Sequence, residues 1–398
     1  MAETFAPTLA AANARIAAVR PAAYALTRNA LDGAVSGLSP YITHGFVTLV
    51  DVWNGVAAGH ALDAQDKFVF ELGWRAYFRH VWQHRGDAIL QSLHEGPLPD
   101  AAYIRELPAD VRQGRTGVPV IDEAVRALYA TGMLHNHARM WLASYLVHVR
   151  KVHWRTGADW LYGHLLDGDL ASNHLSWQWV AGTGSQKPYL FNADNVARHA
   201  PQAWHSPGTV IDASYDALER MARESGYVTR DAVVTPSGVA ETLEPAVSAV
   251  PPDSLGVKAP DASRVVGRDV LLVHPWSLRE RPDCLPAETL PIGLFLSDFH
   301  EEWPWSQRRW QFVGGRMAEL TVERWHGDAA SVNAALSAAR SVRSVDDPHL
   351  QSWLPRWGAS VSTPALFPVV DRRCDSFSQW WSRARHGLPS TAKATTAR

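Results

Sequence analysis

The stretch DGDLASNHLSWQW, residues 167–179, concentrates groups that could do chemistry in an otherwise apolar neighbourhood. Asp169 and Asn173 are four residues apart, so on a helix they share a face. One interpretation is that the acids cap the N-terminus of a helix. The other is that the polar groups bind a flat heterocycle beside Trp177 and Trp179, because burying so many of them without partners would be costly.

The segment LHNHARM, residues 134–140, could supply a partner for Asp167. Asn136 and Met140 share a helical face, and Arg139 lies beside them. A buried arginine needs a carboxylate. We therefore expect an ion pair between Arg139 and Asp167.

Two further stretches combine charged, aromatic and hydroxyl side chains. In ELGWRAYFRH, Glu71 shares a helical face with Trp74 and Arg75, and the ordinary alternative is an exposed ion pair between Glu71 and Arg75. In VSGLSPYI, Ser36 and Ser39 lead into a helix and could donate hydrogen bonds to a phosphate. Ser before Pro is also a common helix start, so this signal is weak by itself.

Composition and motifs exclude several classes of function. The chain has 398 residues and a formal net charge of −2, so any affinity for nucleic acid requires a local patch. Two Cys are too few for a disulfide framework or a four-Cys metal centre, and His135 and His137 point in different directions on a helix, so no metal site is expected. The GxSxG, HExxH and phosphate-loop motifs are absent. Without a signal peptide or an apolar run of about 20 residues, the sequence predicts a cytoplasmic protein with no membrane span.

The elements that position these residues fall into two kinds. Helical periodicity dominates the first part of the chain, where segments 38–60 and 134–154 each predict one continuous helix. Beyond a Pro-, Ser- and Ala-rich stretch, short apolar strands such as DVLLVHP and LPIGLFL alternate with helical segments, which predicts a Rossmann-like parallel α/β sheet. The predicted organisation is an all-α domain at 1–240, a linker at 241–264, an α/β domain at 265–388 and a disordered tail at 389–398.

Four motifs in this order resemble the flavin-binding domain of the DNA photolyase and cryptochrome family: VSGLSPYITHG, ELGWRAYFRH, TGVPVIDEAVRALYATGMLHNHARM and DGDLASNHLSWQWVAGTG. The resemblance runs from about residue 8 to residue 205. It implies an all-α FAD-binding bundle, whose flat ligand would be the isoalloxazine ring. The segments DVLLVHPWSLRERPDCL and PIGLFLSDF look like the first strands of the family's antenna domain. That implies a permuted domain order, with a C-terminal domain that could hold an antenna chromophore.

The resemblance also implies a set of cofactor-binding residues. Arg139 and Asp167 would pair beside the flavin ring, Asn173 would face the flavin N5, and Arg75 would reach the phosphates. Asp169 would accept from the ring or from the adenine side. The full implied set is Tyr24, Ser36, Leu38, Ser39, Arg75, Asn136, Arg139, Asp167, Asp169 and Asn173.

The implied activity is light-driven electron transfer that repairs cyclobutane pyrimidine dimers in ultraviolet-damaged DNA, after the dimer is flipped out of the duplex. The implied cavity is lined by Glu71, Trp74, Asn136, Met140 and Trp179. The implied catalytic residues are Glu71 and Asn173, together with Trp177 and Trp154, which would relay electrons to the flavin. The loop that matches the family's third relay Trp has none, and Tyr103 is its nearest aromatic replacement.

Departures from the family pattern keep two alternatives open. Val35 stands where a Thr is usual, Gly37 and His137 where Arg is common, and Met133 where Trp is frequent. The changes at Val35, Gly37 and His137 remove contacts to phosphates or DNA. The first alternative is a cryptochrome-like blue-light photoreceptor that signals through a protein partner without repair. The second is a light-independent structural protein that binds flavin.

Overall fold

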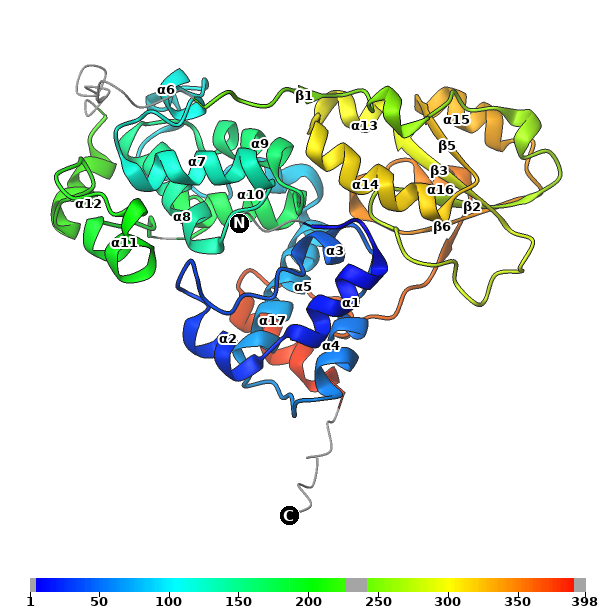
Figure 1. The fold of residues 1–398 in the computed structure, drawn as a ribbon, viewed down its shortest axis with the longest axis horizontal. Helices are drawn as coiled ribbons and strands as arrows, with labels where there is room; N and C mark the ends of the chain where they lie inside the picture. The colour runs from blue at the N-terminus through cyan, green and yellow to red at the C-terminus, as the bar shows by residue number, and fades with distance from the viewer. Residues whose placement is uncertain (1–4, 186, 226–241, 390–398) are drawn as a thin grey trace, which may run out of the picture.

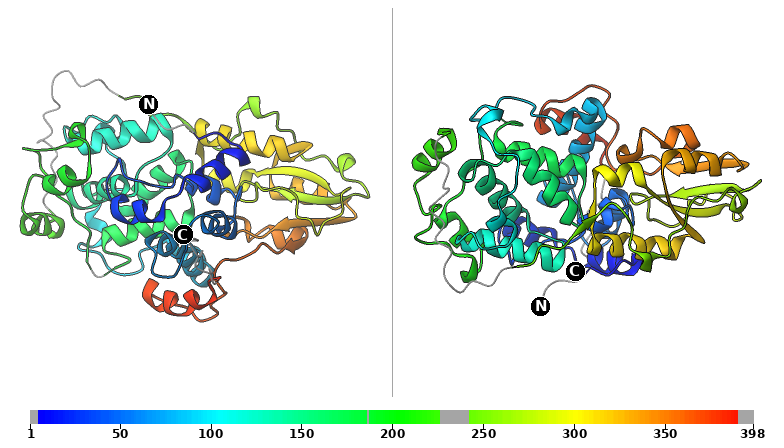
Figure 2. Two further views of the ribbon diagram at one scale, coloured as in Figure 1. Left: turned by 60° about the horizontal axis from the view of Figure 1, so that its bottom comes forward. Right: turned by 90° about the horizontal axis from the view of Figure 1, so that it is seen from above.

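The computed structural model describes residues 5–185, 187–225 and 242–389. Helices α6–α12 form one group, and a sheet with α13–α16 forms another (Figure 1). Helices α1–α5 form a third group together with the C-terminal helix α17, and the further views show this group against both of the others (Figure 2). The predicted tail and the end of the predicted all-α domain lie largely outside the described residues.

The first part of the chain is helical, and its described residues contain no strand before residue 247. Its principal helices are α1 (Leu9–Ala18), α2 (Pro21–Thr27), α3 (Ser39–Thr43), α4 (Leu49–Ala57), α5 (Lys67–Arg85), α6 (Ala109–Arg112), α7 (Pro119–Thr131), α8 (Asn136–Ser144), α9 (Trp154–His164), α10 (Leu170–Ala181), α11 (Ala193–His199) and α12 (Tyr215–Arg223). This arrangement confirms the predicted all-α character.

The second part is an α/β unit built on a parallel sheet of strand order β5-β3-β2-β6-β7. This order is that of a Rossmann-type sheet, in which the chain starts in the middle and reverses direction once. Its elements are β2 (Asp269–Val273), β3 (Leu290–Leu296), α13 (Ser297–Glu302), α14 (Gln307–Leu320), β5 (Glu323–Gly327), α15 (Ala329–Leu336), β6 (Ser341–Val345), α16 (Leu354–Trp357) and β7 (Ala359–Val361). A short antiparallel ribbon joins β1 (Val247–Ser248) to β4 (Trp305–Ser306).

Two predicted helices are wrong as continuous elements. Segment 38–60 forms α3 and α4, separated by a turn at Gly45, which has φ +68°. A Cβ at Gly45 would lie 2.5 Å from the carbonyl oxygen of Trp276, so the turn lets the α/β unit approach closely. Segment 134–154 forms α8, continues as a π-helix over Tyr145–Val149 and then ends before α9.

The C-terminal helix α17 (Phe377–Ala384) packs on α5 rather than on the sheet. A Cβ at Gly73 of α5 would lie 2.4 Å from the ring of Trp381, so the two helices are in close contact. The same hydrophobic core contains buried side chains of α1, α3, α4, α5, the α/β unit and α17. A second core lies among α6–α12. Among the described residues, no helix is long and apolar enough to cross a membrane.

Candidate functional site

The loop between α9 and α10 contains the acids of the DGD motif. Asp169 is the N-cap residue of α10, and its carboxylate accepts a hydrogen bond from the backbone N–H of Ser172 at 2.9 Å. The capping interpretation is therefore confirmed for Asp169. One Nη of Arg139 donates to both carboxylate oxygens of Asp167, at 2.9 and 2.8 Å. The predicted ion pair is present.

Hydroxyl and guanidinium groups from α3 and α5 surround the same loop. Thr43 donates to the backbone carbonyl of Asp167 at 3.2 Å and accepts from Arg75. Burial alone would raise the pKa of the Asp167 carboxyl, but Arg139 outweighs it, with help from the Ser39 hydroxyl and Arg75, and the pKa is lowered. Asp167 therefore remains ionised, which keeps a negative charge at the centre of the site.

Arg79 joins Asp169 to the α/β unit. Its guanidinium lies 2.6 Å from a carboxylate oxygen of Asp169 and 2.9 Å from one of Asp347, which follows β6. The ring Nδ1 of His349 lies 2.6 Å from Asp347, and its Nε2 accepts from the backbone N–H of Leu170 at 3.4 Å. Burial opposes ionisation of both acids, but Arg79 and His349 hold the pKa of each well below its usual range.

Asn173 and Trp177 lie one turn apart on α10 and face α9. The Asn173 amide donates to the carbonyl of Ala158 at 2.8 Å. A Cβ at Gly157 would lie 2.4 Å from the Trp177 ring, so only glycine permits this helix contact. Trp154, at the start of α9, is also buried and donates to the Ser92 hydroxyl at 2.9 Å. Both Trp therefore have fixed orientations in the same core.

Tyr103 lies on the outer side of these two Trp residues. Its ring centroid is 6.3 Å from that of His153, which is 5.8 Å from that of Trp154. Tyr103 is half-buried, so it is accessible to solvent at one end. The structure thus brings the predicted relay replacement to the edge of the aromatic cluster.

Glu71 and Trp74 of α5 have different surroundings from those expected. The ordinary alternative, a Glu71–Arg75 ion pair, is wrong for the described residues: Glu71 lies 3.7 Å from Arg28, and Arg75 donates to Thr43. Burial raises the pKa of the Glu71 carboxyl, an effect that Arg28 partly offsets. One face of the Trp74 ring is covered by Phe377.

The other predicted cavity residues lie on α8 and α10. The exposed side chain of Asn136 lies 3.4 Å from the sulfur of half-buried Met140, one turn later. Trp179 is 43% exposed, and its ring centroid is 5.5 Å from that of Tyr189. Among the described residues, no hydrogen bond, ion pair or aromatic ring contact joins these three side chains to Glu71 or Trp74.

The remaining predicted cofactor residues come from α2 and the entrance of α3. Burial raises the pKa of Tyr24, with nearby Glu71 as a second cause, and its ring packs edge-on against Phe68 at 5.6 Å. The Ser36 hydroxyl accepts from the backbone N–H of Leu38 at 3.4 Å, and Leu38 is buried. This segment is therefore well placed to contribute backbone and hydroxyl groups next to the loop of Asp167.

Sequence reasoning missed Thr43, Arg79, Asp347 and Arg309. Arg79 is four residues after Arg75 on α5, so helical spacing could have indicated it. Asp347 and Arg309 come from the other part of the chain, and no local pattern places them beside the DGD motif.

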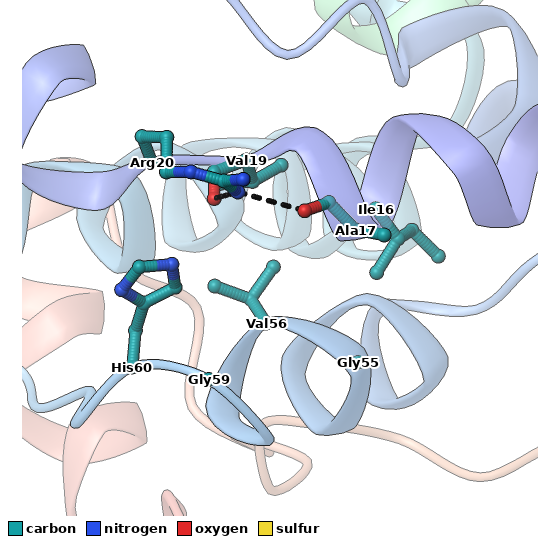
Figure 3. A pocket seen from close by; sticks show the side chains of 8 residues that line it. All are labelled: Ile16, Ala17, Val19, Arg20, Gly55, Val56, Gly59 and His60. Carbon is teal, nitrogen blue, oxygen red and sulfur yellow. Dashed lines mark hydrogen bonds between the residues drawn. The ribbon is translucent and has the colours of Figure 1, made fainter.

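A hollow of about 340 Å³ lies between the C-terminal ends of α1 and α4 (Figure 3). It is lined by Ile16, Val56, Gly55 and Gly59, with Arg20 and His60 at its rim among other residues. Arg20 donates to the carbonyls of Ala17 and Val19, at 2.7 and 2.9 Å, so it acts as a cap on α1. The hollow contains none of the predicted site residues.

Comparison with known proteins supports the resemblance to the photolyase and cryptochrome family. The family model described as the FAD binding domain of DNA photolyase matches residues 68–222. A deoxyribodipyrimidine photo-lyase of Synechococcus is 33% identical over 184 residues, which cover 42% of this chain and 37% of that protein. Cryptochrome-1 of Arabidopsis thaliana is 32% identical over 239 residues, covering 51% and 34%. A crystal structure of a Synechocystis cryptochrome matches 50% of this chain and 44% of that chain at 27% identity, with a TM-score of 0.45.

The chain spans 34–37% of the length of these two curated relatives. The matched residues 68–222 nevertheless contain the DGD loop, Arg75, Arg139 and Asn173, which are the groups that the fold brings together. Residues 68–222 are therefore similar to the FAD binding domain of DNA photolyase, and FAD is the cofactor that this kind of domain binds.

Proposed function

We propose that this protein repairs cyclobutane pyrimidine dimers in DNA under blue light, with FAD bound at the site around the DGD loop. The observation that carries the proposal is the Arg139–Asp167 pair, which lies among the four motifs shared with the family. Relatives named deoxyribodipyrimidine photo-lyase support the activity.

The residues of the site fit FAD. Within the described part of the chain, Arg75 donates a side-chain hydrogen bond only to Thr43, which leaves guanidinium donors for a diphosphate. Asn173 uses its amide N–H on Ala158, which leaves its carbonyl oxygen for the ring. Tyr24, Ser36, Leu38, Ser39, Arg139, Asp167 and Asp169 complete the proposed set. Bound FAD would supply the absorption of light and the electron transfer.

Glu71 is the proposed catalytic acid of the substrate cavity. Its carboxyl is half-exposed on α5, and burial raises its pKa. A raised pKa increases the share of the protonated acid, which can donate a hydrogen bond to a carbonyl oxygen of the dimer. Trp74, Asn136, Met140 and Trp179 are the proposed substrate contacts. Phe377 covers one face of Trp74, so an extruded base would stack on the other face.

Trp177 and Trp154 are proposed to relay electrons to the cofactor, with Tyr103 as the outer donor. Both Trp are 3% exposed, which keeps them dry and rigid beside α10. The ring of His153 contacts the rings of both Tyr103 and Trp154.

The variant Glu71→Gln tests the proposed function. It keeps the shape of the side chain and removes the ionisable acid. We expect unchanged FAD content and at least tenfold less repair per absorbed photon, measured by chromatography as the conversion of thymine dimers to thymines within the DNA. Glu123→Gln, which removes an exposed acid of α7 paired with Arg126, is the matched control. Equal repair by Glu71→Gln and wild type would refute the assignment.

A cryptochrome-like photoreceptor that signals through a protein partner is the second candidate. The observation that favours it is His137, which stands where the family commonly has Arg. Burial, with His135 and His199 nearby, lowers the pKa of His137 to about 4. The ring is therefore neutral at pH 7 and offers no charge to a phosphate. Binding to ultraviolet-damaged DNA that weakens steeply with salt would favour repair, and its absence would favour the photoreceptor.

We also propose that the α/β unit is the counterpart of the family's antenna domain, in permuted order. The support is its parallel Rossmann-type sheet. Ligands of such sheets usually bind at the carboxyl ends of the strands. Here that edge, after β2 and β6, contains Trp276 and His349, whose rings stack at 4.1 Å. A second chromophore should appear in the absorption spectrum of the purified protein beyond that of FAD, and FAD alone would count against it.

A further inference from the structure

Arg309 of α14 is a buried cation that reaches from the α/β unit into the DGD loop. Its side chain is 0% exposed. One Nη donates to the carbonyl of Tyr162 at 3.0 Å, and the other donates to the carbonyl of Gly168, between Asp167 and Asp169. The guanidinium also lies 4.1 Å from the ring centroid of Trp305 and 4.6 Å from that of Tyr162. These contacts hold the group on several sides.

No carboxylate in the described residues lies within ion-pair distance of Arg309. A buried charge without a direct counterion is costly. Burial lowers its pKa, while Tyr162, Asp167 and Asp169 act in the opposite direction. The positive charge of Arg309 is therefore offset across the loop by the carboxylates of Asp167 and Asp169. The guanidinium and these carboxylates form one electrostatic unit in a dry environment.

Other contacts link the same loop to the α/β unit, some of them through His44, the C-cap of α3, and Arg79 of α5. The two ring nitrogens of His44 lie 2.9 Å from the carbonyl oxygen of Leu166 and 2.7 Å from that of Pro275. Asp347 reaches Asp169 through Arg79, and His349 accepts from the N–H of Leu170. The loop from Leu166 to Leu170 is thus attached to the α/β unit along its length.

We propose that Arg309 is a positioning residue of the FAD site, which fixes the DGD loop through Gly168 and raises the potential at which the bound flavin is reduced. This inference rests on the proposed placement of FAD beside Asp167 and Asn173. A positive charge near the loop stabilises negative charge that develops at the site on reduction. By this inference, the α/β unit contributes a residue to the cofactor site.

Arg309→Met in the full chain removes the charge and both hydrogen bonds and keeps an unbranched apolar side chain. We expect a more negative flavin midpoint potential, at least tenfold weaker FAD binding, and faster amide hydrogen exchange at residues 166–170 without FAD. Arg309→Lys keeps the charge, so it should restore the potential while recovering binding only in part.

Arg316→Met is the matched control. Arg316 is on the same helix and 4% exposed, but it pairs with Glu280 and Glu319, away from the loop. Arg316→Met should lower the free energy of unfolding. It should leave the flavin midpoint potential and the amide hydrogen exchange at residues 166–170 unchanged. Gly168→Ala provides a second variant, because the added Cβ would lie 2.5 Å from an Nη of Arg309 and 2.9 Å from the Tyr162 carbonyl oxygen, the two ends of an Arg309 hydrogen bond. It should shift the potential in the same direction as Arg309→Met.

A wild-type potential in FAD-loaded Arg309→Met or in Gly168→Ala would overturn the inference and leave the proposed function intact. An equal shift in Arg316→Met would overturn it too, since the effect would then follow general destabilisation. Failure of wild-type protein to bind FAD would overturn the proposed function together with the inference. If Arg309→Met does not fold, the flavin midpoint potentials of the two other variants decide. The inference requires that Arg309→Lys has the wild-type potential and that Gly168→Ala has a lower one.

Discussion

The indole of Trp74 on α5 and the ring of Phe377 on α17 stack face to face, with centroids 4.1 Å apart and planes inclined by 11°. Phe70, on the same side of α5, also packs against Phe377, at 4.7 Å. The C-terminal helix therefore returns to the helix that contains the proposed substrate residues. It stacks on one face of the Trp74 indole, which Tyr77 and Phe78 also contact, at centroid distances of 5.7 and 5.5 Å.

Phe377→Leu should disturb the orientation of Trp74. We expect the free energy of unfolding to fall by about 1 kcal/mol, since aromatic pairs contribute roughly 0.5–1.5 kcal/mol beyond their buried area. Affinity for dimer-containing DNA should fall as well, because Trp74 is released. Urea unfolding and a DNA titration measure the two effects. Phe367→Leu, whose ring contacts Trp380 and Trp381 instead, should reduce stability only. Equal DNA affinity in both variants and wild type would argue against a substrate role for Trp74.

Asp167→Asn should leave Arg139 without its carboxylate. Breaking a buried ion pair costs about 3–5 kcal/mol, and we expect a loss of up to about 3 kcal/mol here because Arg139 is partly exposed. FAD binding should weaken at least tenfold, measured by flavin fluorescence in a titration. Glu123→Gln, in an exposed ion pair, should cost less than about 1 kcal/mol and leave FAD binding unchanged. Normal FAD affinity in Asp167→Asn would place the flavin elsewhere.

Stability should fall in acid through the carboxyls around Arg79. The pKa values of Asp169 and Asp347 are depressed in the folded state, so both groups contribute stability above their unfolded pKa of about 3.9 and lose it as pH falls below that value. Asp347→Asn should therefore unfold at lower urea than wild type at pH 7, and the difference should shrink at pH 3. Asp346→Asn, whose carboxylate faces Ser360, is the control. A difference of equal size at both pH values would contradict this account.

Trp177→Phe should separate cofactor binding from light-driven reduction. We expect normal FAD content and at least tenfold slower bleaching of oxidised flavin under blue light with an external donor. Trp154→Phe should behave alike, and Tyr103→Phe should slow the reaction if Tyr103 is the outer donor. Trp160→Phe, which alters a Trp of α9 bonded to Glu244, is the control. Wild-type photoreduction in Trp177→Phe would contradict the role of Trp177 as a donor, whereas no photoreduction in either protein would support the light-independent alternative.

Local patterns predicted much of the fold. Helical periodicity predicted the helical character of the first part of the chain, where the described residues form no strand before residue 247. The strand–helix alternation also predicts the parallel sheet. The break at Gly45 was not predicted, because its cause is contact with Trp276 far along the chain. The return of α17 to α5 has the same kind of cause.

The contacts of the candidate site also fall into those that local sequence patterns predict and those that depend on residues far apart in the chain. The Arg139–Asp167 pair could be predicted from the sequence, because both residues lie in apolar segments and a buried arginine needs a carboxylate. The contacts of Arg79 with Asp347, and of Arg309 with Gly168, depend on how the two parts of the chain dock. Helical spacing contains no information on docking, so these residues became evident only in the structure.

The most direct test of the central claim is dimer repair by the purified wild-type protein. Thymine-dimer DNA, reductant and protein are illuminated with blue light, and the absorbance of restored pyrimidines is followed against a dark control. The account predicts regain of this absorbance in the light and none in the dark. No regain from protein that contains FAD and photoreduces would contradict it and favour a photoreceptor with a protein partner.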